Sequence, residues 1–306
     1  MNIAILGAGA MGCLYASMLV NRHNVTLFDS YEPTVNAIEK GGITVCEKSG
    51  EEHNCKVKII ESGSCRNSFD MLIVFVKDMV TESALQANSR LIGSETVVLS
   101  LQNGIGNQQI LEKYTDGKNI LLGTSKHNSV VLEPGKIFHS GNGVTNIGSP
   151  VGNHTLAMKI VEEFSASGIE TEFCGNVNRL LWEKLFINMT INTITAILDT
   201  KIEFVSENKY AKDIMISLVK EAVAVAAADG VPFDVEERTD AVLHVCESLR
   251  GGTASMCQDI ERKRRTEIDF INGAVSRLGR KYSVPTPTHD ALISLIHAKE
   301  STFMSL

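Results

Sequence analysis

The chain has 306 residues, of which 43% are hydrophobic and 21% are charged. This length suits two domains of about 150 residues each, and the composition is that of a folded globular protein and excludes wholesale disorder. The formal net charge of −7 provides no global basic field, so we do not expect nucleic acid or an anionic membrane as a partner.

The first half of the chain alternates short apolar runs with segments of helical length. Four continuous, β-branched runs are typical of buried parallel strands: Ile3–Leu6, Val25–Phe28, Met71–Val76 and Val97–Leu101. Helices are predicted between them, for example over Ala10–Val20 and Met79–Leu91. This alternation predicts an α/β fold with a Rossmann-type, doubly wound sheet. Two additional hairpins are predicted, near Gly41–Ile60 and over Ile137–Ile147, the second with its turn at Gly141–Gly143.

The second half has a different pattern. From about Asn178, apolar residues recur at helical spacing over residues 180–198 and 211–229, and Gly230-Val-Pro232 predicts a sharp helix end. We therefore predict an all-helical second domain. The boundary is placed after the strand-like run Ile169–Phe173, which gives a dinucleotide-binding domain over residues 1–175 and a helical substrate domain over residues 176–306. The long apolar helices are compatible with a homodimer.

The seven cysteines are spread along the chain, and no pair has the CxxC spacing of a zinc or redox motif. We therefore expect reduced thiols, no metal site and a cytoplasmic protein. The apolar run at Ile3–Leu6 is too short for a signal sequence, and no uninterrupted apolar stretch approaches the ~18 residues of a membrane helix.

A glycine-rich loop follows the first predicted strand. Its sequence, Gly7-Ala8-Gly9-Ala10-Met11-Gly12, has the GxGxxG spacing of a dinucleotide-binding loop, with a strand before it and a helix after it. Gly7 permits a tight turn, Gly9 lets the backbone approach a pyrophosphate, and Gly12 lets the helix pack closely on the sheet. The phosphates would lie at the helix N-terminus, so all six residues are predicted to bind the cofactor.

An acidic residue, Asp29, ends the second predicted strand, about 20 residues after the loop. A carboxylate at this position usually binds the adenosine ribose hydroxyls and favours NAD over NADP. No Arg or Lys follows immediately to hold a 2′-phosphate. A helix cap or a turn is the alternative role for Asp29.

Lys184, Asn188 and Asn192 are spaced i, i+4 and i+8, so a regular helix would place them within about 80° of one another on one face. The rest of this predicted helix is largely apolar. Because buried polar groups cost free energy unless they have partners, the stripe indicates a functional site. From spacing alone, a solvent-facing stripe remains the alternative.

Longer motifs are distributed along most of the chain. They are the glycine loop, the strand ending at Phe75-Val-Lys77, Ser100–Asn107, Leu122-Gly-Thr124 with His127, Pro134-Gly135, Leu181–Asn192 and Ser255–Gly273. Together they resemble the ketopantoate reductase (2-dehydropantoate 2-reductase) family, and the last two are specific to it. The resemblance implies NADPH-dependent reduction of the 2-keto acid ketopantoate to pantoate, on the route to pantothenate and coenzyme A.

The resemblance also implies roles for individual residues. Lys184 would be the general acid that polarises the carbonyl and gives the alkoxide a proton. Asn188 and Asn192 would bind the substrate hydroxyl or orient the substrate. Ser255 would bind the substrate carboxylate, and Glu267 would contact Lys184, the substrate hydroxyl or the cofactor and tune proton transfer.

Two more residues follow predicted strands, at the edge of an open α/β sheet where ligands bind. By resemblance, Asn103 lies beside the nicotinamide and the substrate, and Lys77 contacts the cofactor; a simple turn is the alternative for Asn103. Ser255 and Glu267 are 12 positions apart on what we predict to be one helix, so they would differ by roughly 120° in direction.

Some positions depart from the family pattern. Ser30 stands where an NADP-binding Arg is common, so NADP(H) and NAD(H) both stay open as cofactors. The glycines common after the second helix asparagine are absent from Thr193–Lys201, so another small 2-keto acid stays open as the substrate.

Two alternatives come from other functional classes. A catalytically inactive cofactor-binding redox sensor would have no need of the intact polar set. The basic run Arg262–Arg265 is flanked by acidic residues, and helical periodicity would scatter its charges, so a nucleic-acid site is disfavoured.

Overall fold

The computed structural model of the protein describes residues 1–304. By its internal contacts the chain forms two compact units. Unit 1 comprises residues 1–102 and 107–180, and unit 2 comprises residues 103–106 and the chain from residue 181 onward. The boundary falls inside helix α6 (Val177–Ile187), and the short segment Asn103–Gly106 belongs with unit 2 although unit 1 surrounds it in sequence.

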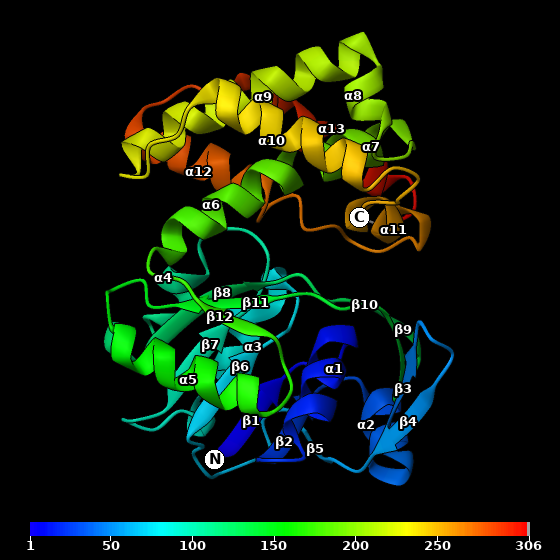
Figure 1. Ribbon diagram of the computed structural model, residues 1–306, viewed down its shortest axis with the longest axis vertical. Helices are drawn as coiled ribbons and strands as arrows, with labels where there is room; N and C mark the ends of the chain where they lie inside the picture. Colours follow the sequence, from blue (N-terminus) through cyan, green and yellow to red (C-terminus); the bar gives the residue numbers. More distant parts are fainter. Residues whose placement is uncertain (305–306) are drawn as a thin grey trace. The chain divides into compact units, whose positions relative to one another are not determined.

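Unit 1 is built on an eight-stranded sheet, in the order β12-β11-β8-β7-β6-β1-β2-β5 (Figure 1). All neighbours pair in parallel except β11 and β8, which are antiparallel. The central strands are buried on both faces, which explains their continuous apolar sequences. The strands are β1 (Asn2–Leu6), β2 (Asn24–Asp29), β5 (Lys58–Glu61), β6 (Met71–Val74), β7 (Val97–Ser100), β8 (Ile120–Ser125), β11 (Thr145–Gly148) and β12 (Thr171–Phe173).

The helices of unit 1 connect these strands. They are α1 (Ala10–Leu19), α2 (Glu32–Gly41), α3 (Thr81–Ala87), α4 (Asn107–Leu111), α5 (His154–Ala166) and the short 3₁₀ turns η1 (Asp78–Val80), η2 (Ser89–Leu91) and η3 (Gly117–Asn119). The helix predicted over Met79–Leu91 is thus interrupted. The buried Asn88 amide donates to Ala84 O at 2.9 Å and accepts from Gly63 N at 2.9 Å, which satisfies the backbone where α3 ends.

A second, four-stranded sheet has the order β4-β3-β10-β9. Its strands are β3 (Ile43–Glu47), β4 (Glu52–Cys55), β9 (Asn128–Glu133) and β10 (Lys136–Gly141), and α1 lies between this sheet and the main sheet (Figure 1). The hairpin predicted near Gly41–Ile60 is confirmed as β3 and β4. The hairpin predicted over Ile137–Ile147 is wrong. β10 pairs with the preceding β9 across Pro134-Gly135, and β11 joins the main sheet.

The Gly141–Gly143 segment therefore connects two sheets instead of turning within one. A Cβ at Gly143 would lie 2.5 Å from the backbone of Lys126, so only glycine allows this close crossing of two chain segments. Nothing in the local alternation of apolar and polar residues indicates which sheet each strand joins.

Unit 2 is helical, as predicted. Besides the later part of α6 it contains η4 (Asn188–Asn192), α7 (Thr193–Leu198), α8 (Phe204–Glu207), α9 (Lys209–Ala228), α10 (Val235–Ser248), α11 (Ser255–Glu261), α12 (Asn272–Tyr282) and α13 (Pro287–Ser301). Its apolar core includes the fully buried Trp182 and Phe186 of α6 and the buried face of α9. Gly230, with φ of +84°, follows the end of α9 as expected. The predicted fold class, a doubly wound sheet followed by a helical domain, is confirmed.

One helix prediction in unit 2 is wrong. Ser255 and Glu267 do not share a helix, because α11 ends at Glu261. Lys263 has φ of +53°, Lys263 N donates to Ile260 O, and Arg264 N donates to Asp259 O at 2.8 Å. These are the bonds of a helix end with a left-handed residue, formed here without a glycine. Glu267 and the basic run Arg262–Arg265 therefore lie in the irregular segment between α11 and α12.

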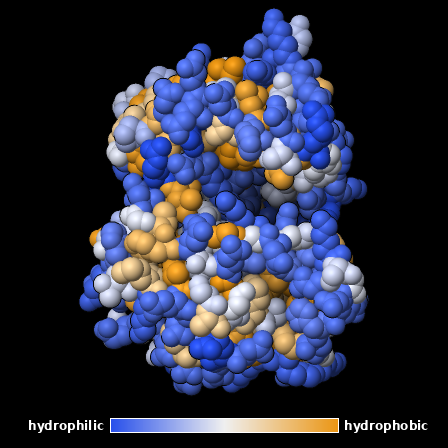
Figure 2. Space-filling model, in the orientation of Figure 1, coloured by the Kyte–Doolittle hydropathy of each residue, from blue (hydrophilic) through white to orange (hydrophobic). Residues whose placement is uncertain are grey.

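The apolar groups are concentrated in the two cores. The face of the molecule in Figure 2 is mostly covered by hydrophilic residues, with hydrophobic groups in scattered patches. Within residues 1–304, no helix is both long enough and apolar enough to cross a membrane.

Candidate functional site

The glycine loop of unit 1 has the geometry of an anion site. Gly7 follows β1 with φ of +106°, and a Cβ at Gly12 would lie 1.8 Å from Gly7 O, so both positions require glycine. By contrast, a Cβ at Gly9 would meet no described atom within 4 Å. α1 begins directly after Gly9, and no described side chain caps its first turn. The start of α1 thus has no side-chain cap and has open space beside Gly9, which fits a pyrophosphate bound by the first backbone N–H groups of the helix.

Asp29 fixes the other side of this loop. It ends β2, its Oδ2 accepts from Ala8 N at 2.6 Å, and its Oδ1 accepts from Tyr31 N at 2.8 Å. The carboxylate is therefore held in place by two backbone N–H groups, and each oxygen retains a lone pair for a further donor. Such a fixed acceptor fits a ribose diol and opposes a 2′-phosphate in the same place.

A pocket of about 350 Å³ lies beside Asp29. Gly7, Asp29 and Ser30 form its polar side, and it is completed by Leu6, Phe28, Ser62, Val76, Val80, Ser83, Ala84 and Ala87. Its position at the carboxyl edge of β1 and β2, between the loop and small residues of α3, fits the adenosine half of a dinucleotide. The sequence predictions missed the α3 residues, although Ser83, Ala84 and Ala87 are small residues at helical spacing just after a predicted strand.

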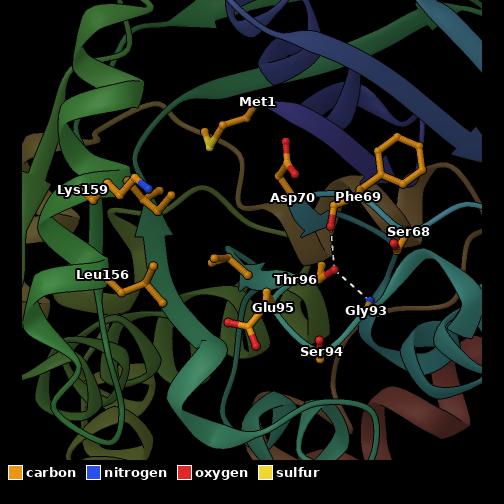
Figure 3. Close-up of a pocket in the computed structure, with 12 residues that line it drawn as sticks. Met1, Ser68, Phe69, Asp70, Gly93, Ser94, Glu95, Thr96, Leu156 and Lys159 are labelled. Carbon is orange, nitrogen blue, oxygen red and sulfur yellow. Dashed lines mark hydrogen bonds between the residues drawn. The ribbon is translucent and has the colours of Figure 1, made fainter.

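Lys77 lies at the same edge, exposed, directly before η1, but it does not line this pocket. A larger pocket, of about 520 Å³, lies at the opposite edge (Figure 3). Met1, Asp70 and Thr96 line it and directly precede β1, β6 and β7. Thr96 Oγ1 donates to Phe69 O at 2.6 Å and accepts from Gly93 N at 2.8 Å, as the dashed lines show. Because ligands of such sheets bind at the carboxyl ends of the strands, this pocket is not the candidate cofactor site.

His127, from the motif after β8, takes part in a chain of imidazoles. His127 Nδ1 lies 3.2 Å from His139 Nε2, and His139 Nδ1 lies 2.9 Å from Glu47 Oε2. Burial, together with the neighbouring His139, lowers the pKa of His127. These hydrogen bonds connect the loop after β8 to β10 and β3 of the small sheet, so they hold the two sheets of unit 1 together.

The predicted substrate residues lie in unit 2. Lys184 is in α6, and Asn188 and Asn192 are the first and last residues of η4. η4 is a π-helical turn, so the regular α-helix predicted through these three residues is wrong at Asn188–Asn192. A π turn takes more residues per revolution than an α-helix, and such turns are frequent at functional sites. Asn192 is 9% exposed, which also argues against a solvent-facing stripe.

Four of the predicted residues form two hydrogen-bonded pairs. Asn192 Nδ2 donates to Ser255 Oγ at 3.3 Å, and Asn103 Nδ2 donates to Glu267 Oε2 at 3.4 Å. A Cβ at Gly104 would lie 2.3 Å from Phe270 O, so glycine after Asn103 allows this segment to approach the Glu267 turn. Asn103 thus belongs to unit 2, together with the predicted substrate residues.

The sequence predictions missed the residues that hold these segments from α13. Glu300 is 4% exposed, and its Oε1 accepts from both the backbone N and Oγ1 of Thr266, each at 2.7 Å, immediately before Glu267. Lys299 Nζ donates to Ala196 O at 2.7 Å at the end of α7. His297 lies 3.0 Å from Glu300 Oε2 and 2.9 Å from Asp269 Oδ1. No spacing or motif in the sequence indicates these long-range contacts.

Comparisons with known proteins find matches along most of the chain. The family model described as ketopantoate reductase PanE/ApbA matches residues 3–152, and its C-terminal counterpart matches residues 176–300. The 2-dehydropantoate 2-reductase of Lactococcus lactis subsp. lactis is 37% identical, and that of Pyrococcus horikoshii 34%, each over 98% of both chains.

Solved structures are also similar over nearly the full length. The ternary structure of D-mandelate dehydrogenase with NADH and anilino(oxo)acetate superposes with a TM-score of 0.93 at 34% identity, covering 99% of each chain. A PanE/ApbA family ketopantoate reductase from Ralstonia eutropha superposes with a TM-score of 0.88 at 29% identity, also covering 99% of each chain.

Proposed function

Because the chain belongs to the ketopantoate reductase family and is an oxidoreductase, we propose that it reduces ketopantoate to pantoate with a nicotinamide cofactor. In this proposal unit 1 binds the cofactor and unit 2 binds the substrate. The observation that carries it is the pairing of Asn192 with Ser255 and of Asn103 with Glu267, in the same unit as Lys184. Polar donors and acceptors gathered in this way suit a small, polar 2-keto acid.

The residues of unit 1 fit the cofactor. The N–H groups at the start of α1 would bind the pyrophosphate, with Gly9 allowing its approach and Gly7 and Gly12 shaping the loop. Asp29 would bind the ribose hydroxyls beside the adenosine pocket, and Lys77 would add a cation at the same edge of the sheet. When bound, the nicotinamide supplies the hydride for the carbonyl carbon.

The residues of unit 2 would complete the reduction. Negative charge develops on the carbonyl oxygen as hydride reaches the carbon, so a cation and a proton are needed at that oxygen. The Lys184 ammonium polarises the oxygen and transfers one proton to it, which gives the secondary alcohol, and it regains a proton from solvent. Ser255 binds the substrate carboxylate, Asn188 and Asn192 bind its hydroxyl, and Glu267 tunes the proton transfer.

A second candidate is an NADH-dependent reductase of another 2-keto acid. Two observations favour it: the Asp29 carboxylate fixed by Ala8 N and Tyr31 N, and the similarity to D-mandelate dehydrogenase with NADH. The compound in that structure, anilino(oxo)acetate, carries a bulky group next to its oxoacetate part. The altered Thr193–Lys201 segment, in the same unit as Asn192, is consistent with a different substrate side chain.

An assay of the purified protein separates the two candidates. It uses NADPH and NADH in turn, with ketopantoate and with a panel of aliphatic and aromatic 2-keto acids. We expect turnover to fall at least 100-fold in Lys184→Ala, because the proton donor is lost. The matched control is Lys220→Ala, an exposed lysine on α9, which should leave turnover unchanged. Preference for ketopantoate supports the first candidate, and preference for bulkier acids with NADH supports the second. Folded protein that binds cofactor but reduces no 2-keto acid would rule out both.

A further inference from the structure

The π turn η4 is held by hydrogen bonds from side chains. Inserting a residue into a helix disturbs its backbone ladder, and the affected carbonyls need other donors. Thr190 Oγ1 donates to Phe186 O at 2.7 Å, and Thr195 Oγ1 donates to Ile191 O at 2.7 Å. Both of these donors belong to the same helical run. A third donor, Asn272, comes from α12, more than 80 positions later, which ties the turn to the rest of unit 2.

The Asn272 side chain contacts both η4 and the residue that follows it. Its side chain is fully buried, its Nδ2 donates to Met189 O at 3.0 Å, and its Oδ1 accepts from Thr193 Oγ1 at 2.6 Å. Met189 lies inside η4 and Thr193 directly follows it. One amide therefore bridges a backbone position within the turn and a side chain just beyond its end, which fixes the helical register between them.

The orientation of this amide is itself fixed by His289. The fully buried His289 ring lies with Nε2 3.2 Å from Leu218 O and Nδ1 3.3 Å from Asn272 Nδ2. A carbonyl only accepts, so Nε2 carries the proton and Nδ1 accepts from Asn272. Burial lowers the pKa of His289, which keeps this neutral form. Both N–H bonds of the Asn272 amide and its oxygen are then used.

We propose that Asn272 is a positioning residue for the substrate: it fixes the register of the π turn and thereby the direction of Asn192 relative to Asn188. The inference rests on the proposed function, in which these two asparagines bind the substrate hydroxyl. If the turn relaxed by one residue, every side chain beyond it would rotate by about 100° relative to those before it. Asn192 would then leave Ser255, while Lys184 in α6 would keep its place.

The sharpest variant is Asn272→Asp, which keeps the size of the side chain. It replaces a donor to Met189 O and His289 Nδ1 with an acceptor, so two acceptors would face a carboxylate oxygen. Thr193→Val removes the hydroxyl that donates to the amide, and Thr193→Ser retains it. Val205→Ala is the control for stability, because it opens a cavity in the core of the same unit without touching this network.

The activity readout uses two substrates: ketopantoate, and 3-methyl-2-oxobutanoate, which has the same keto acid group and no hydroxyl. We expect Asn272→Asp and Thr193→Val to lower kcat/KM for ketopantoate about 10- to 100-fold, because small misplacements of bound groups have effects of this size. The loss for the hydroxyl-free acid should be several-fold smaller. Thr193→Ser should retain activity, and Val205→Ala should lower the melting temperature without changing the ratio of the two substrates.

Amide hydrogen exchange of residues 188–193 gives a second readout that needs no turnover. It should accelerate in Asn272→Asp and Thr193→Val but not in Val205→Ala. Unchanged exchange, or equal losses for both substrates in all three destabilised variants, would overturn the positioning role. A wild-type protein that reduces no 2-keto acid would instead refute the proposed function, and the exchange measurement would still decide whether Asn272 holds the turn.

Discussion

Replacing Asp29 with alanine should change the cofactor preference of the protein. The Asp29 carboxylate accepts hydrogen bonds from Ala8 N and Tyr31 N, so its position beside the pocket proposed for adenosine is fixed before a ligand arrives. Its remaining lone pairs would accept from the ribose hydroxyls of NADH, and its charge would repel the 2′-phosphate of NADPH. We therefore expect Asp29→Ala to weaken NADH binding and to strengthen NADPH binding.

The magnitude follows from these contacts. A hydrogen bond to a charged group contributes about 1.5–3 kcal/mol, so loss of the ribose contact weakens NADH binding roughly 10- to 100-fold. Removing the repulsion strengthens NADPH binding, and the ratio of the two affinities should shift by about 100-fold or more. Loss of the two backbone contacts of this half-buried carboxylate should also reduce the free energy of unfolding by about 1–3 kcal/mol.

Titration of both cofactors, followed by nicotinamide fluorescence, measures the ratio directly. Asp70→Ala is the matched control, because Asp70 accepts from Asn2 N at 2.7 Å at the opposite edge of the same sheet. Ser30→Arg tests the same site without removing Asp29 and should strengthen NADPH binding alone. An Asp29→Ala protein that folds and keeps the wild-type ratio within about threefold would refute this role for the carboxylate.

Two more predictions concern stability and the glycine loop. Burial disfavours charge on His297, but its hydrogen bonds to Glu300 and Asp269 outweigh this and raise its pKa above 6.5. The protonated ring therefore stabilises the folded state fully below pH 6.5, and this contribution is lost as the pH rises through the raised pKa. The His297 side chain is 38% exposed, so solvent weakens these interactions. His297→Gln should therefore lower the free energy of unfolding, measured with urea, by about 1 kcal/mol at pH 6 and by less at pH 9. An equal loss at both pH values would contradict this explanation. Gly12→Ala should cost several kcal/mol because its Cβ would lie 1.8 Å from Gly7 O, whereas Gly9→Ala, facing open space, should melt like the wild type and lose cofactor affinity. Normal cofactor binding by Gly9→Ala in the same titration would show that the pyrophosphate does not approach there.

The sequence predicts those features that depend on local patterns. Buried parallel strands require continuous apolar runs, and the glycine loop requires its spacing, so both could be identified before the structure. The family resemblance then indicated the polar residues of unit 2, which local physics alone left open between a site and a solvated stripe.

The wrong predictions concern features of the fold that depend on contacts between residues far apart in the sequence. The left-handed turn at Lys263 ends α11 without a glycine, so the sequence shows no helix stop. The π turn at Asn188–Asn192 depends on Asn272, which lies far along the chain. The partners of β10 and β11 are likewise chosen by tertiary packing, because either strand has a pattern that suits either sheet.

The contacts of α13 have a consequence for biosynthesis. Through Lys299 and Glu300 this helix holds the end of α7 and the turn before Glu267, and through His289 it orients the Asn272 amide. All of these segments leave the ribosome before α13 does. A nascent chain that has already exposed every proposed catalytic side chain would therefore still lack the helix that arranges them, and catalytic competence would arise only when α13 emerges and docks.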